Sequence, residues 1–317
     1  MCRQESFLSD RAERDSGTLR TSSKKDACRH VGVPHNGHMA IRDVSDTALW
    51  AAVFRARESE RADALFRDPY AHRLAGSRGE QIMAEVAHAG DNDWAWVMRT
   101  YVFDRVIREE LQQGTDMVLN LAAGLDARPY RMELPPHLDW VEMDLPRIFA
   151  YKNEILRDER PLCRVEQVSV DLSDPDARRA ALARAMTGHS RVLVLSEGLL
   201  IYLNAAQVSE LARDLAAAGA ATWVMDLASP GLLGMLQKTT GQATERAGAP
   251  LQFGPREGPA YFEQFGWRPT AALSVFTAAI ETNRVPPELA AFQNFPQPQP
   301  PFGESEIWSG VCVFQRA

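Results

Sequence analysis

DMVLNLAAGLDARPYR, residues 116–131, joins an uncharged apolar run to a turn of small residues and then to the start of a predicted helix. The run at 117–121 has the pattern of a central strand covered on both faces in an α/β sheet. The small residues of the turn are Ala122, Ala123 and Gly124. They let the backbone approach whatever lies above the carboxyl end of the strand, which is where ligands bind in open α/β sheets. The stretch therefore predicts either a plain strand-to-helix turn or a ligand loop, and its neighbours decide between them.

Composition narrows the class of protein. The chain has 317 residues, of which 45% are hydrophobic and 24% charged, so it can bury a sizeable core. Its net charge of -7 argues against a nucleic-acid partner. Since the sequence has neither an apolar run long enough to span a membrane nor a signal-peptide core, we expect a cytoplasmic protein without a membrane partner. The four cysteines lie far apart, so neither a disulfide framework nor a structural zinc site is expected.

The apolar pattern divides the chain into two regions. Residues 1–40 are polar and mixed in charge, and we expect them to form a disordered extension. Cys28 and three nearby histidines lie there, but no predicted helix or strand holds them, so we expect no metal site. Residues 41–317 form the predicted domain. Its expected parts are a helical cap at 45–112, a sheet core at 116–228, a lid insertion at 229–260 and C-terminal strands at 261–317.

Strands and helices alternate after residue 116. The predicted strands are 117–121, 138–143, 164–170, 191–195 and 222–227, and the predicted helices between them include 146–157, 176–185 and 205–217. This alternation is typical of an α/β fold with a mostly parallel sheet. A final strand at 306–315 is expected to be antiparallel.

Acidic residues stand where successive strands end. They are Asp144, Asp171, Glu197 and Asp226, after the second to fifth strands. Nucleotide-binding α/β folds use a carboxylate after the second strand to accept both ribose hydroxyls, which makes Asp144 the candidate for that role. Asp171 is a candidate to recognise an adenine amino group. One acidic strand end can equally cap a helix, but several along the same sheet edge favour a nucleoside site.

The turn also indicates which nucleoside cofactor binds. A dinucleotide site usually carries G-x-G-x-x-G, because backbone amides must surround a pyrophosphate. Residues 122–127, AAGLDA, lack two of these three glycines, which disfavours NAD. S-adenosylmethionine has no phosphate and needs only a close backbone and a carboxylate for its ribose. Both are present, so this cofactor is favoured.

Six motifs carry a family resemblance. In chain order they are SDTALWAAVFRARESERADALFRDPYA, RTYVFD, LNLAAGLDARPYR, VEMDLP, VDLSD and SEGLLIYL. In this order and spacing they resemble the leucine carboxyl methyltransferase family of S-adenosylmethionine-dependent O-methyltransferases. That family includes enzymes that methylate the carboxyl terminus of protein phosphatases and bacterial relatives that act on polyketides and other secondary metabolites. The resemblance implies a Rossmann-like class I methyltransferase fold with an antiparallel last strand, and S-adenosylmethionine as cofactor.

The resemblance also assigns roles to residues. It implies that Arg99 pairs with the methionine carboxylate of the cofactor, with help from Arg57, and that Glu197 lies under the sulfonium. The full set of implied cofactor-binding residues is Arg57, Arg99, Ala122, Ala123, Gly124, Asp144, Leu145, Asp171, Leu172, Glu197 and Gly198. In it, Asp144 holds the ribose, and Asp171 and Leu172 flank the adenine. Many relatives have a glycine at the position of Ala122, so the turn would be strained here if that residue has a positive φ.

The expected reaction is O-methylation of a carboxylate or hydroxyl on a small, apolar metabolite. A carboxylate needs no base, whereas a phenol with its pKa near 10 would need one. Tyr202 is the candidate to touch the acceptor, or else it packs beneath the cap. Leu232, Leu233, Met235 and Phe253 give the lid an apolar inner face, and the proline-rich run before the last strand is expected to be a rigid loop. The alternatives are methylation of a protein carboxyl terminus and a non-catalytic nucleoside-binding protein.

Overall fold

The computed structural model describes residues 44–86, 93–246 and 248–317, which belong to one compact unit, Met39–Ala317. The expected extension at 1–40 lies outside the described residues. None of the described helices is long and apolar enough to cross a membrane.

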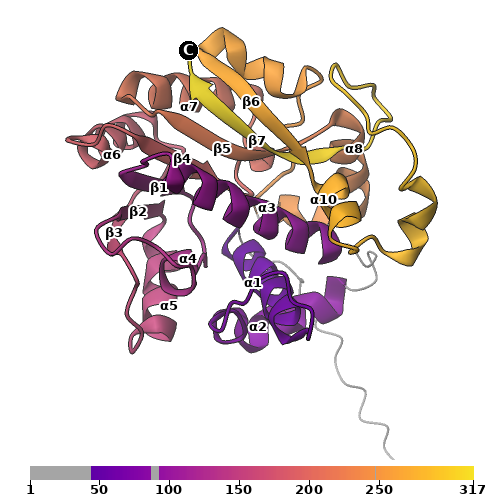
Figure 1. Cartoon of the computed structure of the whole chain (residues 1–317), viewed down its shortest axis with the longest axis horizontal. Coiled ribbons are helices and arrows are strands. Elements are labelled where there is room, and N and C mark those ends of the chain that lie inside the picture. Colours follow the sequence, from indigo (N-terminus) through magenta and orange to yellow (C-terminus); the bar gives the residue numbers. More distant parts are fainter. Residues whose placement is uncertain (1–43, 87–92, 247) are drawn as a thin grey trace, which may run out of the picture. The chain divides into compact units, whose positions relative to one another are not determined.

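One mixed sheet forms the centre of the unit (Figure 1). Its strands are β1 (Met117–Leu121), β2 (Asp139–Asp144), β3 (Arg164–Ser169), β4 (Val192–Ser196), β5 (Thr222–Ala228), β6 (Trp267–Ser274) and β7 (Ser309–Arg316). The spatial order is β3-β2-β1-β4-β5-β7-β6, and the five strands from β3 to β5 pair in parallel. β7 lies between β5 and β6 and is antiparallel to both, which confirms the predicted α/β class and the antiparallel last strand.

Helices cover both faces of the sheet. They are α1 (Val44–Glu60), α2 (Ala71–Val86), α3 (Asp93–Gln112), α4 (Arg128–Arg131), α5 (Pro146–Leu156), α6 (Pro175–Met186), α7 (Ala205–Ala218), α8 (Pro230–Thr239), α9 (Gly241–Arg246) and α10 (Val275–Glu281), with short 3₁₀ turns η2 (Leu200–Tyr202), η3 (Gly258–Phe265) and η4 (Pro287–Phe292). Neighbouring strand residues point to opposite faces. Val118 shares one core cluster with residues of α3 and α10, whereas Leu119 shares another with residues of α6 and α7, so the core has two layers.

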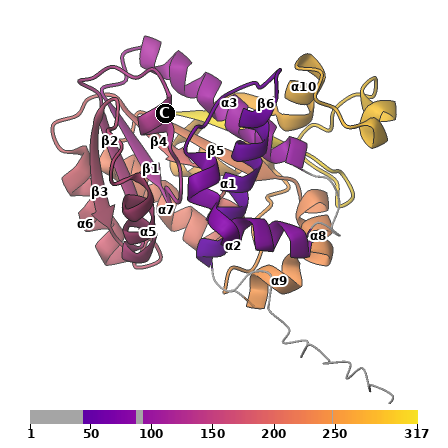
Figure 2. The ribbon, with the colours of Figure 1, turned by 90° about the horizontal axis from the view of Figure 1, so that it is seen from below.

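The cap and the lid lie beside each other. Seen from below, α1 and α2 lie in front of the sheet, with α8 and α9 next to them (Figure 2). Ile82 of α2 packs against Trp50 of α1 and Ala243 of α9, which joins the two parts directly. The expected lid insertion at 229–260 thus begins with two helices. The helix α10 and the turn η4, both after β6, were not predicted.

A serine fixes the start of α8 to the segment that precedes β7. The Ser229 side chain caps the helix by accepting a hydrogen bond from the backbone N–H of Leu232. The same hydroxyl donates to the carbonyl oxygen of Glu306 at 2.5 Å and accepts from the backbone N–H of Trp308 at 2.9 Å. The final strand accordingly starts at Ser309 rather than at the predicted residue 306, because the backbone of 306–308 bonds to Ser229.

Gly231 should be essential for this close approach. A Cβ atom at Gly231 would overlap the Glu306 backbone and lie 2.8 Å from its carbonyl carbon, whereas a Cβ at Gly234, on the same helix, meets no atom within 4 Å. We expect Gly231→Ala to lower the free energy of unfolding by about 2–3 kcal/mol. The matched control Gly234→Ala should raise it by about 0.5–1 kcal/mol, since glycine weakens a helix. Urea unfolding of both variants measures the difference, and equal stability would refute the packing described.

Candidate functional site

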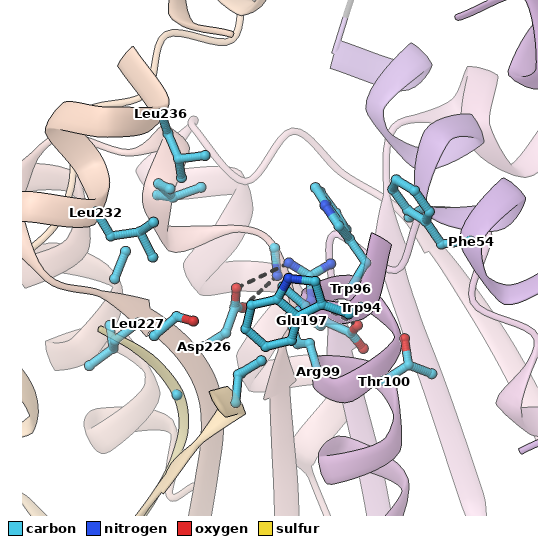
Figure 3. Close-up of a pocket in the computed structure, with 18 of the residues that line it drawn as sticks. Phe54, Trp94, Trp96, Arg99, Thr100, Glu197, Asp226, Leu227, Leu232 and Leu236 are labelled. Atoms are coloured by element: carbon cyan, nitrogen blue, oxygen red, sulfur yellow. Dashed lines mark hydrogen bonds and ion pairs between the residues drawn. The ribbon is translucent and has the colours of Figure 1, made fainter. Parts of the chain in front are cut away.

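A cavity of about 800 Å³ lies at the carboxyl ends of β1, β4 and β5, within the usual size range of small-molecule sites. Residues of α1 and α3 line one side and residues of α8 line the other, as Figure 3 shows for Phe54, Trp94 and Trp96 opposite Leu232 and Leu236. The described residues contain no group of three or more His, Cys, Asp or Glu side chains placed to hold a metal ion.

Arg99 lies between two of the strand-end carboxylates (Figure 3). Its Nε donates to Glu197 at 3.1 Å and its Nη1 donates to Asp226 at 3.2 Å. The guanidinium also stacks 4.5 Å from the ring centre of Trp96. Gly198 has a φ of +65°, and a Cβ there would lie 3.3 Å from Nη2 of Arg99. The missing side chain at Gly198 therefore leaves room for the guanidinium at the cavity wall.

This pair belongs to a larger buried ion-pair network. Arg128 on α4 contacts Asp104 at 2.7 Å, Asp126 at 2.8 Å and Glu197 at 2.8 Å. The network continues from Asp104 through Arg131 and Asp68 to Arg55, and its members are Arg55, Asp68, Arg99, Asp104, Asp126, Arg128, Arg131, Glu197 and Asp226. These are four guanidiniums and five carboxylates. With all of them ionised, the network carries one excess negative charge.

The arginines keep the network ionised. Burial alone would raise the pKa of Asp126, but Arg128, Lys152 and Arg131 lower it to about 2. Burial likewise opposes ionisation of Asp104, yet Arg131 and Arg128 hold the pKa of this carboxyl below its usual value. Arg99 is buried too, and Asp226 and Glu197 raise its pKa. Of these groups, Arg99 and Asp126 line the cavity, to which they present fixed charges at neutral pH.

The turn after β1 has a strained residue, as the sequence indicated. Ala122 has a φ of +50°, a conformation that costs a residue with a side chain about 1–2 kcal/mol. Gly124 has a φ of +54°, and its N–H donates to Oδ2 of Asp144 at 2.7 Å. The other Asp144 oxygen accepts from the N–H of Leu145 at 2.7 Å, and burial raises the pKa of this carboxyl. Asp144 therefore holds the turn in place, and its oxygens keep lone pairs for further donors.

Most of the predicted site residues meet at the cavity. Those that line it are Arg57, Arg99, Ala122, Ala123, Gly124, Glu197, Gly198 and Tyr202. Arg57 is half exposed and lies 4.0 Å from Glu80, an ion pair weak enough to leave Arg57 available to a ligand. Tyr202 is hydrogen-bonded to Thr47, and burial raises the pKa of its phenol.

Four of the predicted residues lie beyond the lining of the cavity. Asp144 and Leu145 follow β2 and reach the site through the contact of Asp144 with the turn at Gly124. Asp171 and Leu172 follow β3, where Asp171 accepts hydrogen bonds from the backbone and side chain of Ser173. Their roles toward ribose and adenine stay predictions.

By position in the chain, the described lining residues fall into two groups of different character, which meet where Phe276 packs against Trp94. The first group, called the N-terminal wall, comprises lining residues 47–227 and holds all the charged residues among them, and the C-terminal wall, lining residues 228–310, holds none of these. Three of the four apolar lid residues predicted to face a substrate line the C-terminal wall, namely Leu232, Met235 and Phe253, and Leu233 does not.

Sequence reasoning missed two groups of lining residues. One is an aromatic group formed by Trp50, Phe54, Trp94 and Trp96. Trp96 precedes Arg99 by three residues on α3, a helical spacing that places neighbours together and could have indicated the contact. The other group comes from η4 and the proline-rich segment, and includes Phe292, Phe295, Ile307 and Trp308. That segment was expected to be only a rigid loop, yet it lines the cavity.

The regions that form this site resemble known proteins. Residues 48–216 match the model of the leucine carboxyl methyltransferase family. A protein of Frankia alni named "Putative S-adenosyl-L-methionine-dependent methyltransferase" is 33% identical over 270 residues, which cover 80% of this chain and 90% of that protein. A protein of Mycobacteroides abscessus with the same name is 34% identical over 194 residues, 56% of this chain. The chain spans only 63% of the length of that relative.

Solved structures show the same fold. A DUF574 family protein from Streptomyces avermitilis superposes with a TM-score of 0.55 at 12% identity, covering 86% of this chain and 97% of that one. A structure from Thermobifida fusca gives a TM-score of 0.56 at 16% identity and covers 90% and 99%.

The strain at Ala122 is open to measurement. We expect Ala122→Gly to raise the free energy of unfolding by about 1 kcal/mol, because glycine adopts a positive φ at no steric cost. Ala123 is buried and does not have a positive φ, so Ala123→Gly should instead destabilise the protein. Thermal unfolding of the two variants distinguishes the positions. A loss of stability in Ala122→Gly would contradict the conformation of the turn.

Proposed function

The chain belongs to the leucine carboxyl methyltransferase family, and we propose that it is an S-adenosylmethionine-dependent O-methyltransferase acting on a small, apolar metabolite. The methyl group goes to a carboxylate or hydroxyl of that acceptor. The observation that carries the proposal is the cavity with two unlike walls. Its charged wall suits a zwitterionic nucleoside cofactor, and its uncharged wall suits an apolar acceptor.

The charges of the site fit this cofactor. S-adenosylmethionine has a sulfonium, an ammonium and a carboxylate, so its amino-acid and sulfonium groups sum to one positive charge. The ion-pair network has one excess negative charge, which this cation offsets. Arg99 uses Nε and Nη1 for Glu197 and Asp226, and its Nη2 lies beside Gly198 at the cavity wall. A ligand carboxylate can accept from that nitrogen.

The positions of these residues support the following roles in the proposed complex. Arg99 binds its carboxylate, and the backbone of the turn at Gly124 lies along its methionine part. Asp144, which already fixes that turn, accepts the ribose hydroxyls with its remaining lone pairs. Glu197 and Asp226 offset its positive charge.

When bound, the cofactor supplies a methyl group that is already activated by a positively charged sulfur. What this chain does is position and desolvate the acceptor. The C-terminal wall excludes water around the acceptor, and the fixed charges of the other wall hold the cofactor still. A carboxylate acceptor needs no base. For a hydroxyl, a carboxylate of the lining is the candidate to take the proton, because none of the described residues that line the cavity is a histidine or a lysine.

Arg99 tests the placement of the cofactor. We expect Arg99→Ala to weaken the binding of S-adenosylhomocysteine by about 1.5–3 kcal/mol, the range for a charge-assisted hydrogen bond. Binding of 5′-methylthioadenosine, which lacks the amino-acid part, should stay unchanged in the same variant, and this comparison shows that the variant is folded. Arg108→Ala, an exposed arginine on the same helix, is the control. Calorimetric titration gives both affinities. An equal loss of affinity for both ligands would mean that Arg99 does not contact the amino-acid part of the cofactor.

Methyl transfer itself tests the reaction class. Matched pairs of acids and alcohols on one apolar skeleton, incubated with methyl-labelled S-adenosylmethionine, should yield a methyl ester or a methyl ether detectable by mass spectrometry. Asp144→Ala should abolish transfer, since the cofactor loses its ribose contact. Labelling confined to a peptide with a free carboxyl terminus would favour the protein-methylating alternative instead.

A further inference from the structure

We propose that the acceptor is longer than the cavity and that its uncharged apolar tail leaves through a mouth formed by Phe292, Phe295 and Ile307. These side chains bind the tail and select acceptors by length. The inference rests on the proposed function and adds the class of substrate: an elongated lipophilic molecule with its reacting group at one end.

The mouth is defined by exposed apolar side chains that also line the cavity. Phe292, Phe295 and Ile307 are 54%, 63% and 56% exposed, respectively. All three belong to the C-terminal wall, and the rings of Phe292 and Phe295 lie 6.2 Å apart. The other large exposed hydrophobic residues of the described chain, Tyr151 and Leu162, do not line the cavity. Single exposed apolar residues are ordinary, but three that line one cavity indicate a binding surface.

The wall that leads to the mouth offers no charged anchor, and its polar side chains are three threonines, Ser274, Gln297 and Ser309. No charged residue lines it between 228 and 310. Its threonines have already used their hydroxyl protons, because Thr239, Thr240 and Thr244 donate to backbone carbonyls of α8 and of the turn into α9. A ligand part that lies here gains no ion pair and mainly exchanges water for apolar surface, so an uncharged, apolar part binds best.

The charges set the direction in which the acceptor lies. Arg99, Glu197 and Asp226 lie together at the strand ends, and in Figure 3 they stand between Leu232 and Leu236 on one side and Phe54 on the other. The reacting oxygen must reach the charged end, where the cofactor is proposed to bind. The other end of the molecule then follows the C-terminal wall toward Phe292 and Phe295.

The tail of the acceptor suits the mouth better than a partner protein does. The three exposed side chains are themselves part of the cavity lining, so a sufficiently long ligand in the cavity meets them. A stable protein interface buries about 800 Å² on each partner, which far exceeds what three side chains supply.

The test uses primary alcohols of increasing chain length, from hexanol to dodecanol, titrated into the full chain with saturating S-adenosylhomocysteine. For the unmodified protein the affinity should keep rising to the longest chains. Phe295→Ser should lower the affinity for dodecanol about fivefold and leave the affinity for hexanol unchanged, because only the long chain reaches the mouth. Leu162→Ser, which removes an apolar side chain of similar exposure away from the cavity, should change neither affinity.

The other outcomes overturn either the proposal or the function on which it rests. If Phe295→Ser changes the affinity for both alcohols equally, the mouth does not select acceptors by length. A change from dimer to monomer in light scattering, without any change for dodecanol, means that a second copy of the chain covers the mouth. If S-adenosylhomocysteine binds but chain length has no effect, the inference fails and the proposed function stands. If S-adenosylhomocysteine does not bind, the proposed function fails, and the alcohols titrated alone still report on the mouth.

Discussion

Arg128 is the residue on which the rest of the site depends. It is almost fully buried and reaches three carboxylates, on α3, in the turn after β1 and after β4. Taking such charges out of water costs several kcal/mol per ion, which only close pairing offsets. The helical cap and the strand ends can therefore assemble only in the arrangement that brings these partners together. Through Glu197 the same network fixes Arg99 at the cavity wall.

This constraint explains why the cavity has two unlike walls. The N-terminal wall contains the ion pairs that hold the cap on the sheet, so it is necessarily charged. The C-terminal wall comes from α8, η4 and the segment before β7, which Ser229 joins through hydrogen bonds to the backbone alone. Nothing in that junction requires a charge. The second wall is thus free to be apolar, and the two together suit a charged cofactor and a lipophilic acceptor.

Much of the fold could be predicted from the sequence, because the signal is local. The strand at 117–121 has the predicted bounds, and Ala122 has the positive φ under which the turn was expected to be strained. The acidic strand ends were informative for the same reason, since carboxyl ends of parallel strands share one edge. The match of 48–216 to the family model confirms the resemblance carried by the six motifs.

What the sequence could not show depends on long-range contacts. Arg99 and Asp226 are 127 residues apart, and no spacing rule pairs them. Phe295 lies in a proline-rich run whose local pattern indicates only a loop, so its place at the cavity follows from how β7 returns between β5 and β6. Asp226 was noticed as a strand end but not as a site residue, because its partner lies on the cap.

The most direct measurement of the central claim is a thermal-shift titration with S-adenosylmethionine, S-adenosylhomocysteine and NAD, because a ligand that prefers the native state raises its stability. If the charged wall binds a nucleoside without phosphates, both adenosyl compounds should raise the unfolding temperature in a concentration-dependent way. NAD should not raise it. A rise with NAD alone, or no response to either adenosyl compound, would contradict the account.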